Sequence, residues 1–134
     1  MCRIAGWVDF SQDLSHQEQI MNKMTDALIY GEQGDSRHWF SNHAAFSYKK
    51  LIAIEPENGH HPIVHQINDC NYALLYNGEL YNTKDLSKEL FSLGHTFRDH
   101  SDTEVILNAY IEWGEGCVER FNGIFAIAIW DENK

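Results

Sequence analysis

The chain opens with Met-Cys-Arg-Ile-Ala-Gly-Trp-Val (residues 1–8), where a cysteine follows the initiator methionine and leads into an apolar, strand-like run. If Met1 is removed, Cys2 carries both a nucleophilic sulfur and a free α-amine. An α-amine has an unperturbed pKa of about 7.7–8.0, so near neutral pH it can take the thiol's proton directly or through a water. The stretch predicts a nucleophile with its own base; the alternative is a buried or unreactive thiol.

Length and composition favour one globular domain. The chain has 134 residues, is 43% hydrophobic and carries a formal net charge of −10. That charge repels phosphate backbones and anionic membrane surfaces, so we expect no nucleic-acid partner. No apolar run approaches the roughly 20 residues of a membrane span, and the opening lacks the pattern of a signal peptide, so we expect a soluble, cytoplasmic protein with no membrane partner.

The first half of the chain predicts one helix followed by short strands. Ser-His-Gln-Glu (residues 15–18) has the spacing of a capping box, and the apolar stripe from Ile20 to Leu28 predicts the helix that follows. The polar residues 31–36 predict a loop. Because the links between the later apolar runs are too short for crossovers, we expect antiparallel strands at 43–48, 51–54 and 63–67.

The second half predicts a strand at 71–76 that ends at Asn77-Gly78, a dipeptide suited to left-handed backbone. Helices are predicted at 83–93 and from a second capping box, residues 101–104, to Gly114. The run 124–130 is apolar on both faces, which is typical of a strand covered on each side. This order indicates an α+β fold with packed sheets and helical layers outside them.

Four blocks occur in order along the chain: Met1-Cys2, Tyr-Asn-Gly-Glu-Leu-Tyr-Asn (76–82), Ser-Asp-Thr-Glu (101–104) and Phe-Asn-Gly-Ile-Phe-Ala (121–126). Together they closely resemble the glutaminase domain of glutamine-hydrolysing asparagine synthetases, which are class II glutamine amidotransferases. The resemblance covers residues 1–134 as one such domain. It implies an N-terminal-nucleophile hydrolase-like αββα sandwich, with antiparallel sheets between helical layers.

The resemblance implies a glutaminase reaction and a role for each matching residue. Cys2 would attack the glutamine side-chain amide, giving a thioester and ammonia, which a synthetase domain would use to make asparagine. The side-chain amide of Asn77 and the backbone N–H of Gly78 would stabilise the oxyanion. The alternative for Asn77 and Gly78 is an ordinary hairpin turn, which would be the preferred interpretation without the N-terminal cysteine.

Three further residues would bind the substrate's α-groups. Glu79 and Asp102 would accept hydrogen bonds from the α-ammonium, since carboxylates offer only acceptors. The alternatives are a solvated loop acid for Glu79 and a favourable charge at a helix N-terminus for Asp102. Lys50 corresponds to the family's arginine that grips the α-carboxylate; lysine keeps the charge without the bidentate fork, so we expect weaker glutamine binding.

Other departures from the family pattern fall near the same site. Arg3 follows the cysteine where a small residue is usual, and Tyr-Gly-Glu-Gln-Gly (30–34) replaces the family's His-Arg-Gly-Pro-Asp loop. The chain stops at Lys134, whereas the family continues with further strands and a synthetase domain. We therefore expect a truncated domain with an exposed edge along 124–130, covered by a homodimer partner or a synthetase-domain chain.

Two readings of the activity stay open. One is an enzyme; the other is a catalytically impaired relative that serves as a binding or regulatory domain. The chain has eight histidines, but they form no helical pair with a carboxylate and no set with paired cysteines, so we expect no metal site. The resemblance implies no cofactor in this domain, because ATP and magnesium would belong to the absent synthetase domain.

Overall fold

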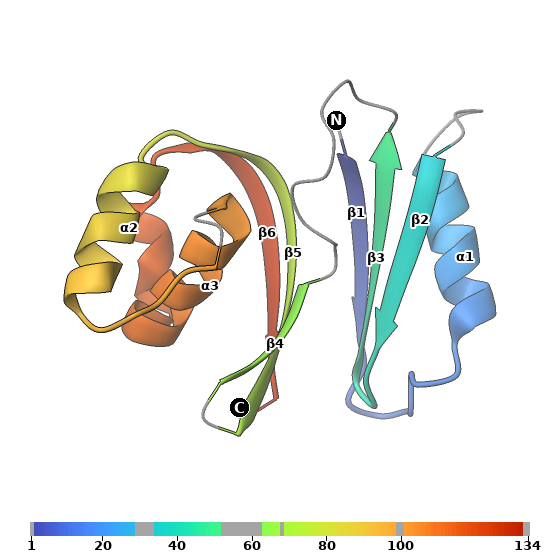
Figure 1. Ribbon diagram of the computed structural model, residues 1–134. Coiled ribbons are helices and arrows are strands. Elements are labelled where there is room, and N and C mark those ends of the chain that lie inside the picture. Colours follow the sequence, from blue (N-terminus) through green and yellow to red (C-terminus); the bar gives the residue numbers. More distant parts are fainter. Residues whose placement is uncertain (1, 29–33, 52–62, 68, 99–100, 133–134) are drawn as a thin grey trace. The chain divides into compact units, whose positions relative to one another are not determined.

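The computed structural model describes residues 2–28, 34–51, 63–67, 69–98 and 101–132, which form strands in two sheets and helices beside them (Figure 1). The elements are β1 (Cys2–Val8), α1 (Glu18–Ala27), β2 (Gly34–Phe40), β3 (Ala44–Leu51), β4 (Ile63–Ile67), β5 (Cys70–Leu80), α2 (Thr83–Ser92), α3 (Asp102–Trp113), the 3-10 helix η1 (Gly114–Arg120) and β6 (Gly123–Asp131). They form two compact units: unit 1 is Met1–Asn77 with Ile127–Lys134, and unit 2 is Gly78–Ala126.

Unit 1 contains a three-stranded sheet in the order β1-β3-β2, in which both outer strands run antiparallel to β3. The sequence predicts two separate strands, at 43–48 and 51–54. This is wrong, because a single strand, β3, continues through Lys49 and Lys50 to Leu51. Residues 52–54 lie outside the described part. The loop predicted at 31–36 is also wrong from residue 34 onward. Ser36 and Arg37 are exposed on β2, and as an outer strand it lacks the apolar alternation that reveals strands in a sequence.

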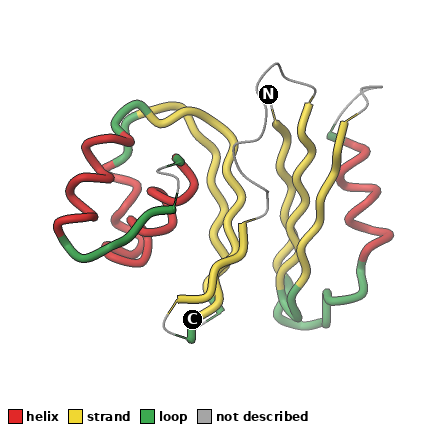
Figure 2. Tube along the Cα trace, viewed as in Figure 1, coloured by secondary structure: helices red, strands yellow, loops and turns green. Residues whose placement is uncertain are grey.

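Helix α1 lies against one face of this sheet (Figure 2). Its Thr25 is buried, and the Thr25 hydroxyl donates a hydrogen bond to the carbonyl oxygen of Met21 at 2.7 Å. The same oxygen lies 3.1 Å from Nε2 of His38 on β2 and in close contact with the buried Ser47 hydroxyl on β3. A buried polar cluster therefore joins α1 to two strands.

The capping box predicted at residues 15–18 does not form. The N-cap of α1 is Gln17, which makes no side-chain cap bond. The Ser15 hydroxyl instead donates to Asp13 Oδ1 at 2.6 Å, and the Ser15 backbone N–H donates to the same oxygen at 2.9 Å. In a capping box the serine oxygen would accept from a backbone N–H, but α1 begins after Gln17, two residues past Ser15, and Ser15 bonds Asp13 as a donor.

The second sheet has the order β4-β5-β6, and β4 runs antiparallel to β5. The Tyr81 N–H donates to the Asn122 carbonyl at 2.7 Å, and the Glu132 N–H donates to the Asn71 carbonyl at 3.2 Å. The first bond joins the end of β5 to the start of β6, and the second joins the start of β5 to the end of β6. These two strands are therefore antiparallel too. Within the described residues β6 is an edge strand, as expected; what covers it stays a prediction.

The two sheets pack together in unit 1, which confirms the α+β fold with packed antiparallel sheets. Phe46 and Tyr48 of β3 and Ala73 and Leu75 of β5 form a buried cluster, and Trp130 of β6 is among the residues at its border. The expectation that the whole of 124–130 is covered on both faces is wrong at Ile124, which is 73% exposed, and at Ala126, which is also exposed.

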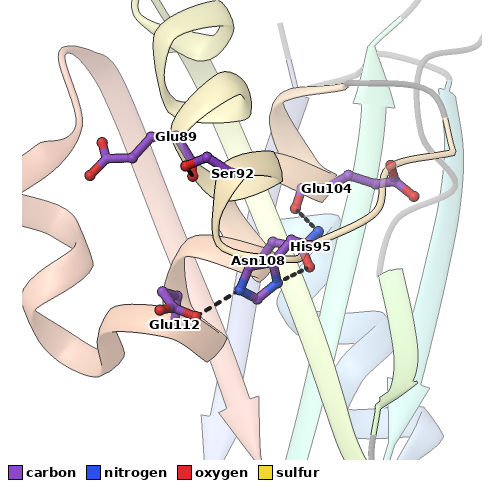
Figure 3. Close-up of polar contacts among 6 residues, drawn as sticks. All are labelled: Glu89, Ser92, His95, Glu104, Asn108 and Glu112. Atoms are coloured by element: carbon purple, nitrogen blue, oxygen red, sulfur yellow. Dashed lines mark hydrogen bonds and ion pairs between the residues drawn. The ribbon is translucent and has the colours of Figure 1, made fainter.

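Unit 2 contains α2, α3 and η1 together with the ends of β5 and β6. Both predicted helices are confirmed, and the Ser101 side chain caps α3 by accepting from the Glu104 N–H at 3.4 Å. The segment after α2 is tied to α3 through His95, whose Nδ1 lies 3.1 Å from Asn108 Oδ1 and whose Nε2 lies 2.8 Å from Glu112 Oε2 (Figure 3). Within the described part of the chain, no helix is long and apolar enough to cross a membrane.

Candidate functional site

The predicted site residues fall on both units. Those in unit 1 are Cys2, Lys50 and Asn77, and those in unit 2 are Gly78, Glu79 and Asp102.

Strand pairing in unit 1 brings two of these residues together. Cys2 is the first residue of β1, and its Cα partner across the antiparallel ladder is Lys50 of β3. The Cα atoms of directly paired antiparallel residues lie about 4.5–5.5 Å apart. The next pair joins Arg3 and Lys49, so the first two pairs of this ladder contain three basic residues. This register places the predicted nucleophile beside the residue predicted to bind a carboxylate.

Asn77 and Gly78 lie inside β5, which continues to Leu80, so the hairpin-turn alternative for this dipeptide is wrong. Gly78 has φ of +152°, and a Cβ added there would lie 2.2 Å from the Ile124 carbonyl oxygen and 2.6 Å from the Phe125 Cα. Contacts this short with backbone leave no space for a side chain. The fold itself therefore requires glycine at position 78, in addition to any role of its N–H in catalysis.

Gly123 of β6 mirrors this arrangement. A Cβ at Gly123 would lie 2.2 Å from the Glu79 carbonyl oxygen. Asn82 secures the same junction: its Nδ2 donates to the Arg120 carbonyl at 2.8 Å, and its Oδ1 accepts from the Asn122 N–H at 3.0 Å. Residues of the motif blocks 76–82 and 121–126 are therefore in close backbone contact with each other. The two hydrogen bonds of the Asn82 side chain to the backbone before β6 were not predicted from the sequence.

The carboxylate of Asp102 joins the start of α3 to the end of β5. Its Oδ2 accepts from the Leu80 N–H at 3.2 Å, and its Oδ1 accepts from the Thr83 hydroxyl at 2.6 Å. Glu79, the other predicted α-ammonium ligand, is exposed and directly precedes Leu80. Unit 2 therefore brings Gly78, Glu79 and Asp102 to one place. The bond from Thr83 to Asp102 was not predicted from the sequence. The only feature that could have indicated it is that Thr83 has a hydroxyl group and begins the helix after block 76–82.

Of the other two cysteines, Cys117 is unsuited to nucleophilic chemistry. It is 2% exposed, and burial raises the pKa of its thiol, which keeps the sulfur protonated and unreactive. Among the described residues, no three histidine, cysteine or acidic side chains are grouped so as to hold a metal ion.

Unit 1 has a concave surface among its described residues. It is an open hollow of about 580 Å³ between the ends of several strands. Asn77, Gly78, Glu79 and Asp102 do not line it. Its lining is rich in rings: Phe10, Trp39, Phe40, His43 and Trp130.

Comparison with known proteins gives a family match and several relatives. Residues 1–134 match the family described as glutamine amidotransferase domain. The chain is 48% identical to asparagine synthetase (glutamine-hydrolyzing) 3 of Bacillus subtilis and 34% identical to asparagine synthetase (glutamine-hydrolyzing) 2 of the same organism. Each alignment covers 100% of this chain but only 22% and 18% of the respective relative, so the chain spans about a fifth of their length.

A solved structure shows the same fold. The glutamine phosphoribosylpyrophosphate amidotransferase of B. subtilis superimposes with a TM-score of 0.55 over 69% of this chain and 22% of its own, at 24% identity. The family resemblance carried by the four motif blocks is confirmed by the match to residues 1–134. The chain therefore belongs to the glutamine amidotransferase domain family, and glutamine-hydrolysing asparagine synthetases are among its relatives.

Proposed function

We propose that this chain is a glutaminase domain, which hydrolyses the side-chain amide of glutamine to glutamate and ammonia through a thioester on Cys2. The observation that carries the proposal is the family match over residues 1–134, which includes a cysteine directly after Met1. The pairing of Cys2 with Lys50 and the grouping of Gly78, Glu79 and Asp102 support it.

In the proposed reaction, removal of Met1 gives Cys2 a free α-amine, which takes the thiol proton. The sulfur attacks the amide carbon, and the Asn77 amide and the Gly78 N–H donate to the oxyanion that forms. When the C–N bond breaks, the proton held by the α-amine leaves with the nitrogen as ammonia, and a thioester remains. A water molecule, deprotonated by the same amine, then attacks the thioester; glutamate leaves and the thiol is restored.

The remaining residues would bind the amino-acid end of the substrate. Lys50 would pair with the α-carboxylate, while Glu79 and Asp102 would accept from the α-ammonium. For the ammonia itself, we propose transfer to a synthetase domain, since relatives about five times as long as this chain are named as asparagine synthetases. A partner that supplies such a domain, or a second copy of this chain, would also cover the β6 edge.

The test is the intact mass of the purified chain before and after incubation with a diazo-ketone analogue of glutamine, together with an assay of ammonia release from glutamine. We expect a mass without Met1 and one adduct, absent in Cys2→Ala and retained in the control Cys70→Ala. A retained methionine, or a free Cys2 that neither takes up the label nor releases ammonia, would indicate a non-catalytic relative instead.

A further inference from the structure

The Asp102 carboxylate lies where three segments of unit 2 meet: the end of β5, the start of α2 and the start of α3. It is half-buried, and each of its oxygens has a donor from a different segment. The Leu80 N–H bonds Oδ2 at 3.2 Å, and the Thr83 hydroxyl bonds Oδ1 at 2.6 Å. Asp102 is thus oriented by groups that lie more than 18 residues earlier in the chain.

The Thr83 hydroxyl has two acceptors within reach but only one proton. Its oxygen lies 2.6 Å from Asp102 Oδ1 and 3.0 Å from the Leu80 carbonyl oxygen. An ionised carboxylate is the stronger acceptor, and 2.6 Å is typical of a charge-assisted O–H···O⁻ bond. The proton therefore goes to Asp102.

This bond controls the rotation of the carboxylate. The χ2 torsion of aspartate has a broad, weakly restricted distribution, so a single donor leaves the plane of the carboxylate poorly determined. Donors on both oxygens determine that plane. An ionised carboxylate has about four acceptor sites, and the Leu80 N–H and the Thr83 hydroxyl use two of them.

We infer that Thr83 is a positioning residue for substrate binding: its hydroxyl orients the Asp102 carboxylate toward the α-ammonium of glutamine. This inference rests on the proposed function, because it takes glutamine as the ligand. It assigns Thr83 an effect on recognition of the α-ammonium and none on the attack of Cys2.

The test measures binding directly, in a Cys2→Ala background that prevents turnover. Isothermal titration gives Kd for glutamine and for 4-carbamoylbutanoate, which has the same amide and carboxylate but no α-amino group. Thr83→Val removes the hydroxyl at nearly constant volume, Thr83→Ser keeps it, and Thr96→Val is the control at an exposed threonine of the same unit. Asp102→Asn with and without Thr83→Val completes a double-mutant cycle.

We expect Thr83→Val to raise Kd for glutamine about tenfold, since a hydrogen bond to a charged group is at stake. Thr83→Ser should restore Kd to within about threefold, and Thr83→Val should add little in the Asp102→Asn background. Kd for 4-carbamoylbutanoate should be the same with Val and Thr. Equal losses for both ligands, or no change for glutamine, would overturn the inference in favour of a purely structural role.

Ammonia release by the chain with Cys2 intact separates the two proposals. A chain that binds glutamine in a Thr83-dependent way without releasing ammonia would refute the glutaminase proposal and leave the role of Thr83 standing. A chain that releases ammonia but binds equally well with Val at position 83 would refute only the role of Thr83. Failure to bind glutamine at all would refute both. If Thr83→Val does not fold, the Thr83→Ser, Asp102→Asn and Thr83→Ala variants give the same decision.

Discussion

Unit 1 and unit 2 hold their predicted site residues by different means. In unit 1, Cys2 and Lys50 are paired by backbone register, which does not depend on their side chains. In unit 2, Asp102 is held by a side-chain hydroxyl and a backbone N–H, and Gly78 by the absence of a side chain. Backbone register tolerates substitution, whereas specific contacts do not. Residues of the same type in the two units allow this difference to be tested.

The largest difference should come from glycine. Gly78→Ala in unit 2 places a Cβ 2.2 Å from the Ile124 oxygen at a φ of +152°, so we expect a loss of at least about 3 kcal/mol in unfolding free energy. Gly6→Ala in unit 1 meets Phe46 Cδ1 at 3.4 Å, an ordinary contact, and should change stability by no more than about 1 kcal/mol. Urea unfolding measures both. Equal effects would remove the contrast between the units.

Threonine should give the next largest contrast. Thr25→Val in unit 1 leaves the buried Ser47 hydroxyl and His38 without their shared partner, which should cost about 1–3 kcal/mol of stability. Thr83→Val in unit 2 removes a partner from a half-buried carboxylate that water reaches, and should cost about 1 kcal/mol or less. Thermal unfolding compares the two variants. A larger loss for Thr83→Val would contradict the assignment of Thr83 to ligand binding.

The two serines with capping-box spacing should differ by a smaller amount. Ser101→Ala removes the bond from the Glu104 N–H at the start of α3, so we expect a loss of about 1 kcal/mol. Ser15→Ala should cost less than about 0.5 kcal/mol, because Ser15 bonds Asp13 on an exposed segment and caps no helix. Urea midpoints of the two variants give the comparison. Equal losses would mean that Ser15 does stabilise α1.

The smallest expected effect concerns pH. The side chain of Gln12, followed by the hydroxyl and N–H of Ser11, lowers the pKa of the unit 1 residue Asp9 to about 2. A carboxyl whose pKa is lower in the folded state stabilises the fold above its unfolded pKa of about 3.9. That contribution should be lost as pH falls from about 4 to 2. Asp9→Asn should flatten the pH dependence of the melting temperature over this window, and an unchanged slope would exclude the contribution.

Much of the secondary structure could be predicted from local patterns. Helices α2 and α3 were predicted because Ser101, Gly94 and Gly114 are capping residues that act within a few positions along the chain. Strand β4 matches its predicted bounds of 63–67. Strand β5 continues past its predicted end at Asn77-Gly78 because strand pairing, a tertiary interaction, outweighs the turn preference of the dipeptide.

The candidate site was only partly predictable for the same reason. Cys2, Gly78 and Asp102 stand in motif blocks that sequence comparison detects. Thr83 and Asn82 act on residues about 20 and 40 positions away, through single hydrogen bonds, and no spacing rule connects them. The stretch around Tyr30 and residues 52–62, which contain family departures and a predicted strand end, lie outside the described residues.

The division of the chain also sets an order for folding. Unit 2 is one continuous segment, Gly78–Ala126, whereas unit 1 needs residues 127–132 to return to the start of β5. That return closes a separation of 61 residues between Asn71 and Glu132. Contacts distant in sequence form more slowly because chain closure costs entropy. We therefore expect the amides of α2 and α3 to gain protection from hydrogen exchange before those of β1 and β3. Unit 2, which carries Glu79 and Asp102, would then fold before unit 1, which carries Cys2.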